Sequence, residues 1–231
     1  MIKVHTIAGT EVKVREFESW NERMFVHYGN DRLYYHPNRI IRMIQAQRIR
    51  TIVSFMEIAD SDVVLDAGCG EGYIFSRLPR SVRRVGIDLS LTALEIASHR
   101  NSDIEWIRSD VQRMPFDSNT FDKVCCSEVI EHVIDPEAVI EELYRVVKPT
   151  GRVVITVPNE RTINRVKDMI LNTRLGRRIF PDIPLRTEWH LTEYTPRLLR
   201  SQICRRFIVQ REKVLPIAGL GLGYSVLCTP K

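Results

Sequence analysis

Residues 63–78 of the 231-residue chain read VVLDAGCGEGYIFSRL and give the clearest indication of its fold. A short apolar run ends at Asp66, Gly68, Gly70 and Gly72 follow, and the chain then takes on a helical pattern. Glycine is needed where the backbone must adopt a positive φ angle or approach a ligand closely. A strand, a glycine turn and a helix in this order indicate a βαβ unit with a ligand-binding turn.

The spacing of the glycines limits the classes of ligand that the turn can bind. A dinucleotide fingerprint needs its third glycine three residues after the second, and Tyr73 stands at that position. No G-K-[ST] follows, so the phosphate-loop pattern also fails. Nicotinamide, flavin and nucleoside triphosphate sites are therefore disfavoured.

Strand and helix patterns alternate on both sides of this turn. This alternation predicts an α/β fold with parallel strands and helices on both faces of the sheet. The predicted strands are 63–66, 82–88, 104–110, 121–127 and 152–158, the predicted helices are 71–78, 90–100 and 136–147, and the runs 206–214 and 223–229 are typical of a closing hairpin. Asp135 and Pro136 provide a clear start for the third helix.

Two segments flank the alternating region. Residues 1–60 are expected to form a small hairpin and a helical lid, and 61–231 one catalytic domain that carries a basic insertion at about 160–190. Tyr34 and its aromatic neighbours can either close over a ligand or pack on the N-terminal helix.

Three aspartates end consecutive predicted strands. Asp66, Asp88 and Asp110 are spaced 22 residues apart. Ligands of open α/β sheets bind at the carboxyl ends of the strands, where Asp88 can accept hydrogen bonds from ribose hydroxyls and Asp110 from the exocyclic amine of an adenine. A site lined by acids suits a nucleoside that carries positive charge and no phosphate.

These motifs resemble the class I S-adenosylmethionine-dependent methyltransferases. The resemblance covers about 63–158, through VVLDAGCGEG, VGIDLS, SDVQRMPFDSNTFDKVCCSEVIEHV and ELYRVVKPTGRVVITVPN. It implies a Rossmann-like sheet of seven mostly parallel strands with a reversed C-terminal hairpin, and S-adenosylmethionine as the cofactor. It also implies a set of cofactor-binding residues: Asp66, Gly68, Cys69, Gly70, Gly72, Asp88, Leu89, Asp110, Val111 and Ser127.

The stretch SEVIEH at 127–132 follows the fourth predicted strand, on the edge where a methyl acceptor must approach. On a helix, Glu128, Glu131 and His132 would lie on one side. Three interpretations remain open: a charged helical turn with no further role, His132 as general base or acceptor-orienting group with Glu131 beside it, or a metal site of all three for a hard cation such as Mg²⁺.

The metal interpretation draws on a finer resemblance. The E-x-x-E-H pattern, the YYHPNRIIRMI segment before the domain and the long basic insertion resemble the ubiquinone-biosynthesis O-methyltransferases of the UbiG type. Small-RNA 2′-O-methyltransferases share E-x-x-E-H and use later histidines, a part that His190 could play here. A second downstream histidine is missing, which weakens the resemblance to the small-RNA methyltransferases.

The basic insertion allows several interpretations. Residues 160–178 carry arginines around an apolar stripe, which favours a lid helix over the active site. Peripheral contact with an anionic membrane is the second possibility. A nucleic-acid groove is disfavoured, because few aromatic residues alternate with the arginines.

Composition supports an ordinary enzyme. The net charge is +5, and 44% of residues are apolar. The five cysteines form no C-x-x-C pair, and the N-terminus has no apolar leader, so we expect a cytoplasmic location. We predict O-methylation of a small, hydroxylated and apolar acceptor. The alternatives are an RNA or protein methyltransferase that uses the E-x-x-E-H site, or a non-catalytic protein that binds S-adenosylmethionine.

Overall fold

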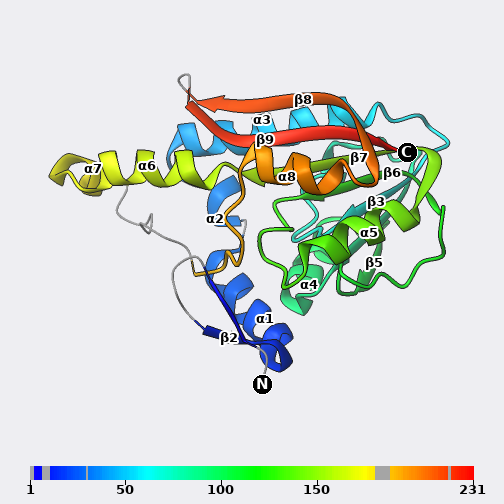
Figure 1. Ribbon diagram of the computed structural model, residues 1–231, viewed down its shortest axis with the longest axis horizontal. Coiled ribbons are helices and arrows are strands. Elements are labelled where there is room, and N and C mark those ends of the chain that lie inside the picture. The colour runs from blue at the N-terminus through cyan, green and yellow to red at the C-terminus, as the bar shows by residue number, and fades with distance from the viewer. Residues whose placement is uncertain (1–2, 7–10, 30, 180–187, 218–219) are drawn as a thin grey trace.

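A seven-stranded sheet in the order β5-β4-β3-β6-β7-β9-β8 forms the centre of the protein (Figure 1). The computed structural model describes residues 3–6, 11–29, 31–179, 188–217 and 220–231. The strands from β5 to β7 are parallel, whereas β9 pairs antiparallel with both β7 and β8. This confirms the predicted sheet with its reversed hairpin. The strands are β3 (Val63–Ala67), β4 (Arg83–Asp88), β5 (Glu105–Arg108), β6 (Phe121–Ser127), β7 (Val147–Pro158), β8 (Phe207–Ile217) and β9 (Leu220–Pro230).

Helices cover both faces of the sheet. Val64 belongs to one apolar cluster with Ile52, whereas the next residue, Leu65, belongs to a second cluster with Leu143 and Leu199. Successive strand side chains point to opposite faces, so both faces are buried. The covering helices are α3 (Arg39–Met56) and α4 (Leu91–Arg100) on the first face and α5 (Pro136–Val146) and α8 (Pro196–Ile203) on the second.

The start of α5 follows the expectation from sequence. The side chain of Asp135 accepts hydrogen bonds of 3.1 Å from the backbone N–H groups of Glu137 and Ala138, and Pro136 is the first helical residue. A carboxylate at this position satisfies N–H groups that have no partner within the helix.

The predicted helix at 71–78 is wrong. Only a short 3₁₀ turn, η2 (Phe75–Arg77), forms there. Gly72 still has a positive φ angle of 76°, which an α-helix cannot include. At the other end, Leu78 is extended because Pro79 follows it, and a residue before proline avoids the helical region.

The N-terminal segment forms the expected hairpin and helices. They are β1 (Lys3–His5), β2 (Glu11–Lys13), η1 (Val14–Glu16), α1 (Phe17–Tyr28) and α2 (Asp31–Tyr34). In Figure 1, α1 lies beside α4, far from the β8–β9 hairpin. The carboxylate of Glu22 accepts hydrogen bonds of 3.1 and 3.2 Å from the N–H groups of Leu91 and Thr92, and so fastens α1 to the start of α4.

The basic insertion contains α6 (Glu160–Leu171) and α7 (Arg174–Ile179). These helices extend beyond the sheet, to the left in Figure 1. Within the described ranges, the chain contains no helix that is both long enough and apolar enough to cross a membrane.

Candidate active site

A pocket opens at the carboxyl ends of β3, β4 and β6. It lies where the strand order reverses, because β4 and β5 are on one side of β3 while β6 and β7 are on the other. Nine of the ten predicted cofactor residues line it: Asp66, Gly68, Cys69, Gly70, Asp88, Leu89, Asp110, Val111 and Ser127. Gly72 does not line the pocket. A Cβ atom there would stand 2.6 Å from the Trp106 ring, so this glycine serves packing.

Hydrogen bonds to Asp88 fix the conformation of the glycine turn beside the pocket. Gly68 and Gly70 have φ angles of 79° and 50°, and a Cβ atom on Gly68 would stand 2.3 Å from Val129. One oxygen of Asp88 accepts a hydrogen bond of 2.8 Å from the Gly70 N–H, and the other accepts one of 2.9 Å from the Ser90 N–H. The carboxylate therefore joins the turn to the start of α4 and still faces the pocket.

Asp66 lies behind the turn with only 1% of its surface exposed. Its Oδ1 atom has no hydrogen-bond partner in the structure. Burial, together with the charge of Asp88, raises the pKa of Asp66 to about 8. A cationic ligand group in the pocket would stabilise its ionised form.

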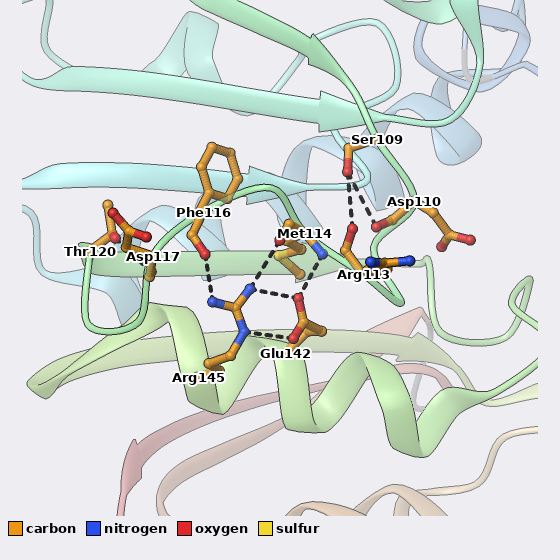
Figure 2. Close-up of polar contacts among 9 residues, drawn as sticks. All are labelled: Ser109, Asp110, Arg113, Met114, Phe116, Asp117, Thr120, Glu142 and Arg145. Atoms are coloured by element: carbon orange, nitrogen blue, oxygen red, sulfur yellow. Dashed lines mark hydrogen bonds and ion pairs between the residues drawn. The ribbon is translucent and has the colours of Figure 1, made fainter.

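The loop that carries Asp110 is clamped from α5 (Figure 2). Arg145 donates hydrogen bonds of 2.5 Å and 3.0 Å to the carbonyl oxygens of Phe116 and Met114, and Glu142 accepts one of 2.6 Å from the Met114 N–H. The hydrogen bond from Arg145 lowers the pKa of Glu142. The clamp fixes the loop that presents Asp110 to the pocket.

The turn after β6 is not a helix, so the helical interpretation of SEVIEH is wrong. Glu128 has a left-handed φ angle of 56°, while its N–H still pairs with the Thr156 carbonyl at 3.0 Å, as a strand residue does. The Glu131 carbonyl accepts hydrogen bonds from the N–H groups of Leu191 and Thr192, at 2.8 and 3.1 Å. These bonds bring the segment that contains His190 against the turn.

Glu128 and Glu131 have different surroundings. Glu128 forms an ion pair of 3.0 Å with Arg48 and accepts a hydrogen bond of 3.0 Å from the Thr156 hydroxyl. Glu131 is fully buried, and neither of its carboxylate oxygens has a hydrogen-bond partner. Burial and the charge of Glu128 raise the pKa of Glu131 well above its usual value.

Glu131 lies in a compact group with two imidazoles. Each of three residues offers one atom that could bind a metal, and these three atoms lie within 4.8 Å of one another. The residues are Glu131, His132 and His190. His190 also contacts Glu160, with 2.6 Å between Nδ1 and Oε1. A buried carboxyl group without hydrogen bonds is stable when it keeps a proton or when it binds a cation. The predicted metal residues Glu131 and His132 thus lie in this group, where His190 takes the place that sequence reasoning gave to Glu128.

His132 presents a neutral imidazole to the pocket. Its Nδ1 atom lies 3.1 Å from the carbonyl oxygen of Trp189, and a carbonyl can only accept, so Nδ1 carries the proton. Burial and the neighbouring His190 lower the pKa of His132 well below its usual value. At neutral pH, Nε2 is therefore free to accept a proton or to bind a cation.

Sequence reasoning missed Arg48, which lines the same pocket. It extends from α3, and its side chain is 12% exposed. Arg48 donates a hydrogen bond of 3.3 Å to the hydroxyl of Tyr34 and pairs with Glu128. The signal was present in the sequence, because Arg48 falls four residues from both Ile44 and Ile52 on the apolar stripe of the helix.

Aromatic side chains close the end of the pocket near His132. The centroid of the Trp189 ring lies 4.4 Å from that of His132 and 6.4 Å from that of Tyr28. The Phe25 ring meets Trp189 edge-on, with 6.2 Å between the centroids. Phe25 and Trp189 both line the pocket. The described pocket lining thus includes Phe25 of α1 and Trp189 near the end of the insertion, but no residue of α6 or α7.

Comparisons with known proteins place this site in a family context. Residues 65–155 match the family model described as a methyltransferase domain. The chain is 35% identical over 120 residues to a demethylmenaquinone methyltransferase of Paenarthrobacter aurescens, covering 51% of this chain and 47% of that one. It is 30% identical over 118 residues to a ubiquinone biosynthesis O-methyltransferase of Coxiella burnetii, covering 49% and 48%. The chain thus spans about half the length of the curated relatives it matches.

Solved structures agree on the fold. The PH0226 protein of Pyrococcus horikoshii superposes with a TM-score of 0.67 at 18% identity, covering 90% of this chain and 98% of that one. The N-methyltransferase NodS of Bradyrhizobium japonicum, in complex with S-adenosyl-L-homocysteine, superposes with a TM-score of 0.65 at 15% identity. The match covers 93% of this chain and 98% of that one. Together with the strand order, these matches show a Rossmann-like methyltransferase fold.

Proposed function

We propose that this chain, which belongs to the class I S-adenosylmethionine-dependent methyltransferases through residues 65–155, methylates a hydroxyl group of a small molecule. The observation that carries the proposal is the imidazole of His132 in the pocket lining, with its Nδ1 atom held by the Trp189 carbonyl. A hydroxyl acceptor must lose a proton, and a general base at this position can take it.

The acidic end of the pocket suits the cofactor. Asp66 has an unpartnered oxygen for the ammonium group, and Asp88 and Asp110 line the wall where ribose and adenine would lie. Arg48 would hold the carboxylate of the methionine part, because a guanidinium binds carboxylates in a bidentate manner. Gly68 and Gly70 line the pocket and carry no Cβ atom, so the ligand can approach the backbone of the turn closely.

The chemistry requires little beyond alignment and proton removal. When bound, S-adenosylmethionine would supply an electrophilic methyl group for the acceptor oxygen, with S-adenosylhomocysteine as the leaving group. His132 Nε2 takes the hydroxyl proton. Phe25 and Trp189 exclude water and orient the acceptor.

The acceptor that fits best is a flat, apolar ring that carries a hydroxyl group. Phe25, Trp189 and the His132 ring line the pocket, and Tyr28 stacks on Trp189, so this wall favours offset or edge-on contacts with such a ring. The relatives named for demethylmenaquinone and ubiquinone biosynthesis support this acceptor class. The buried free cysteines fit a reducing compartment such as the cytoplasm.

To test the proposal, a mass-spectrometric screen with methyl-labelled S-adenosylmethionine would offer phenols and hydroquinones to the protein. We expect labelled methyl ether with at least one of them, and a loss of about 100-fold in kcat for His132→Asn with unchanged cofactor affinity. His99→Asn, at an exposed position of α4, is the matched control. Methylation only of RNA or protein, with a steep dependence on salt for RNA, would favour the alternative class. Cofactor binding without methylation of any acceptor would favour a non-catalytic protein.

The same region could hold a divalent cation. The buried carboxylate of Glu131 and the imidazoles of His132 and His190 fit such an ion, although two imidazoles and one carboxylate suit Zn²⁺ or Mn²⁺ better than the Mg²⁺ expected from the sequence. When bound, the ion would lower the pKa of the acceptor hydroxyl. Metal content after dialysis against Zn²⁺, Mn²⁺ or Mg²⁺ tests this. Glu131→Gln should lose the ion, and the exposed Glu95→Gln should keep it.

We also propose that the insertion contacts an anionic membrane. Met169 and Leu175 are each 67% exposed, and Arg174, Arg177 and Arg178 are exposed beside them. Apolar and basic side chains together bind the headgroup boundary of a bilayer. Flotation with phosphatidylglycerol vesicles should fall when these three arginines become glutamine. The same change at the exposed Arg23, Arg80 and Arg197 should have no effect.

A further inference from the structure

A second hollow lies on the outer side of the glycine turn. This groove, of about 900 Å³, runs between α2, α3, η2 and the end of α4. Its lining differs from that of the cofactor pocket, apart from the shared residues Tyr34 and Tyr73. Its volume falls in the range of small-molecule sites. We call it the arginine groove, after Arg42, Arg50, Arg77 and Arg100 in its lining.

The charge of the groove is positive. Its lining contains these four arginines and no acidic residue. Arg100 is neutralised by Asp31, which lies 2.6 Å from its Nη2 atom. Within the described part of the chain, no carboxylate pairs with Arg42, Arg50 or Arg77. Several guanidinium groups around one hollow attract an anion, and their fork geometry fits the oxygens of a phosphate.

Aromatic rings lie among these arginines. The rings of Tyr34 and Tyr73 are stacked with 3.7 Å between centroids, and the guanidinium of Arg100 lies 4.3 Å from the Tyr73 centroid. Tyr35 remains 69% exposed, although such a ring is usually at least half covered in a folded protein. An exposed ring beside arginines offers a stacking surface for a flat base. The described helices α6 and α7 contain arginines but no aromatic residue.

We propose that the arginine groove binds a nucleotide, with its phosphates on Arg42, Arg50 and Arg77 and its base on Tyr35. This goes beyond the proposed methyl transfer, which uses the pocket on the other side of the Tyr34–Tyr73 pair. The phosphate and the base could belong to a free nucleotide or to a nucleotide within single-stranded RNA, and the test distinguishes these two sources.

The test measures binding of ATP and of a labelled U8 oligonucleotide by calorimetry and fluorescence anisotropy. We expect saturable binding of at least one probe, weakened at least tenfold in the double variant Arg50→Gln/Arg77→Gln and about fivefold in Tyr35→Ala. Binding of ATP assigns the groove to free nucleotides, and binding of the oligonucleotide alone assigns it to RNA.

The control is Arg23→Gln/Arg80→Gln, at exposed positions outside the groove. It should bind as the wild type does, and all variants should keep their affinity for S-adenosylmethionine, which shows that they are folded. Absence of saturable binding to both probes, or an equal loss in the control, would overturn the proposal. If Tyr35→Ala binds the probes as the wild type does, the base does not stack on Tyr35, and that part of the proposal is overturned.

Discussion

The two ends of the candidate active-site pocket are built in different ways. The proposed cofactor end contains Asp66 within β3, Asp88 as the last residue of β4, and Asp110 just after β5. The proposed acceptor end combines the turn after β6 with Trp189 and His190, which lie more than 50 residues further along the chain. Parallel strands bring their carboxyl ends to one edge by necessity, whereas the acceptor end depends on contacts between distant segments. The fold thus supplies the first end, and the packing of loops supplies the second.

The largest expected effect is at the cofactor end. Asp88→Ala removes the acceptor of the Gly70 and Ser90 N–H bonds together with the ribose contact, so we expect affinity for S-adenosylmethionine to fall about 100-fold. Calorimetric titration measures the change, and Glu95→Ala, at an exposed position of the following helix α4, is the control. Unchanged affinity would show that the acids do not form the cofactor end.

Arg48 tests whether the two ends are independent. It lines the pocket and pairs with Glu128. Arg48→Gln therefore leaves the Glu128 carboxylate without an ion-pair partner, although only 23% of the Glu128 side chain is exposed. We expect a loss of about 2 kcal/mol in the free energy of unfolding and about tenfold weaker cofactor binding. Urea unfolding and calorimetry measure these quantities. If stability falls while affinity does not, Arg48 belongs to the acceptor end alone.

The cofactor end should respond to pH through Asp66. Its pKa of about 8 means that the free protein keeps a proton on this carboxyl group at neutral pH. A cationic cofactor favours the ionised form, so affinity should rise by up to about tenfold per pH unit below pH 8 and level off above it. Because the folded pKa lies above the unfolded one, the stability contribution of Asp66 is lost as the pH rises toward 8. Asp66→Asn should therefore bind weakly, show a flat pH profile and melt at a higher temperature at pH 8.

The smallest effect concerns the clamp in Figure 2, which supports the cofactor end from α5. Glu142→Gln weakens the pair with Arg145, and we expect a loss of about 1 kcal/mol in the free energy of unfolding at pH 7. The folded pKa of Glu142 lies below its unfolded value, so its contribution is present above about pH 4.5 and disappears as the pH falls through the folded pKa. Thermal melts at pH 7 and pH 3 measure this. Glu141→Gln, in an exposed pair with Arg206, should change little.

The sheet and the acids of the proposed cofactor end could be predicted from local patterns in the sequence. Apolar runs bounded by turn residues placed the strands, Asp135 and Pro136 placed the start of α5, and the regular spacing of the acids placed them at one edge. These features are local, because each depends on residues within one or two turns of the chain.

The proposed acceptor end could not be predicted in this way, because it depends on contacts between distant segments. Glu128 adopts a left-handed conformation because its N–H continues the pairing with β7, so SEVIEH cannot become helical. Arg48 then pairs with Glu128, and the distant His190 joins Glu131 and His132. A short charged segment has no strong preference of its own, so the partners that the fold brings to it decide its conformation and its chemistry.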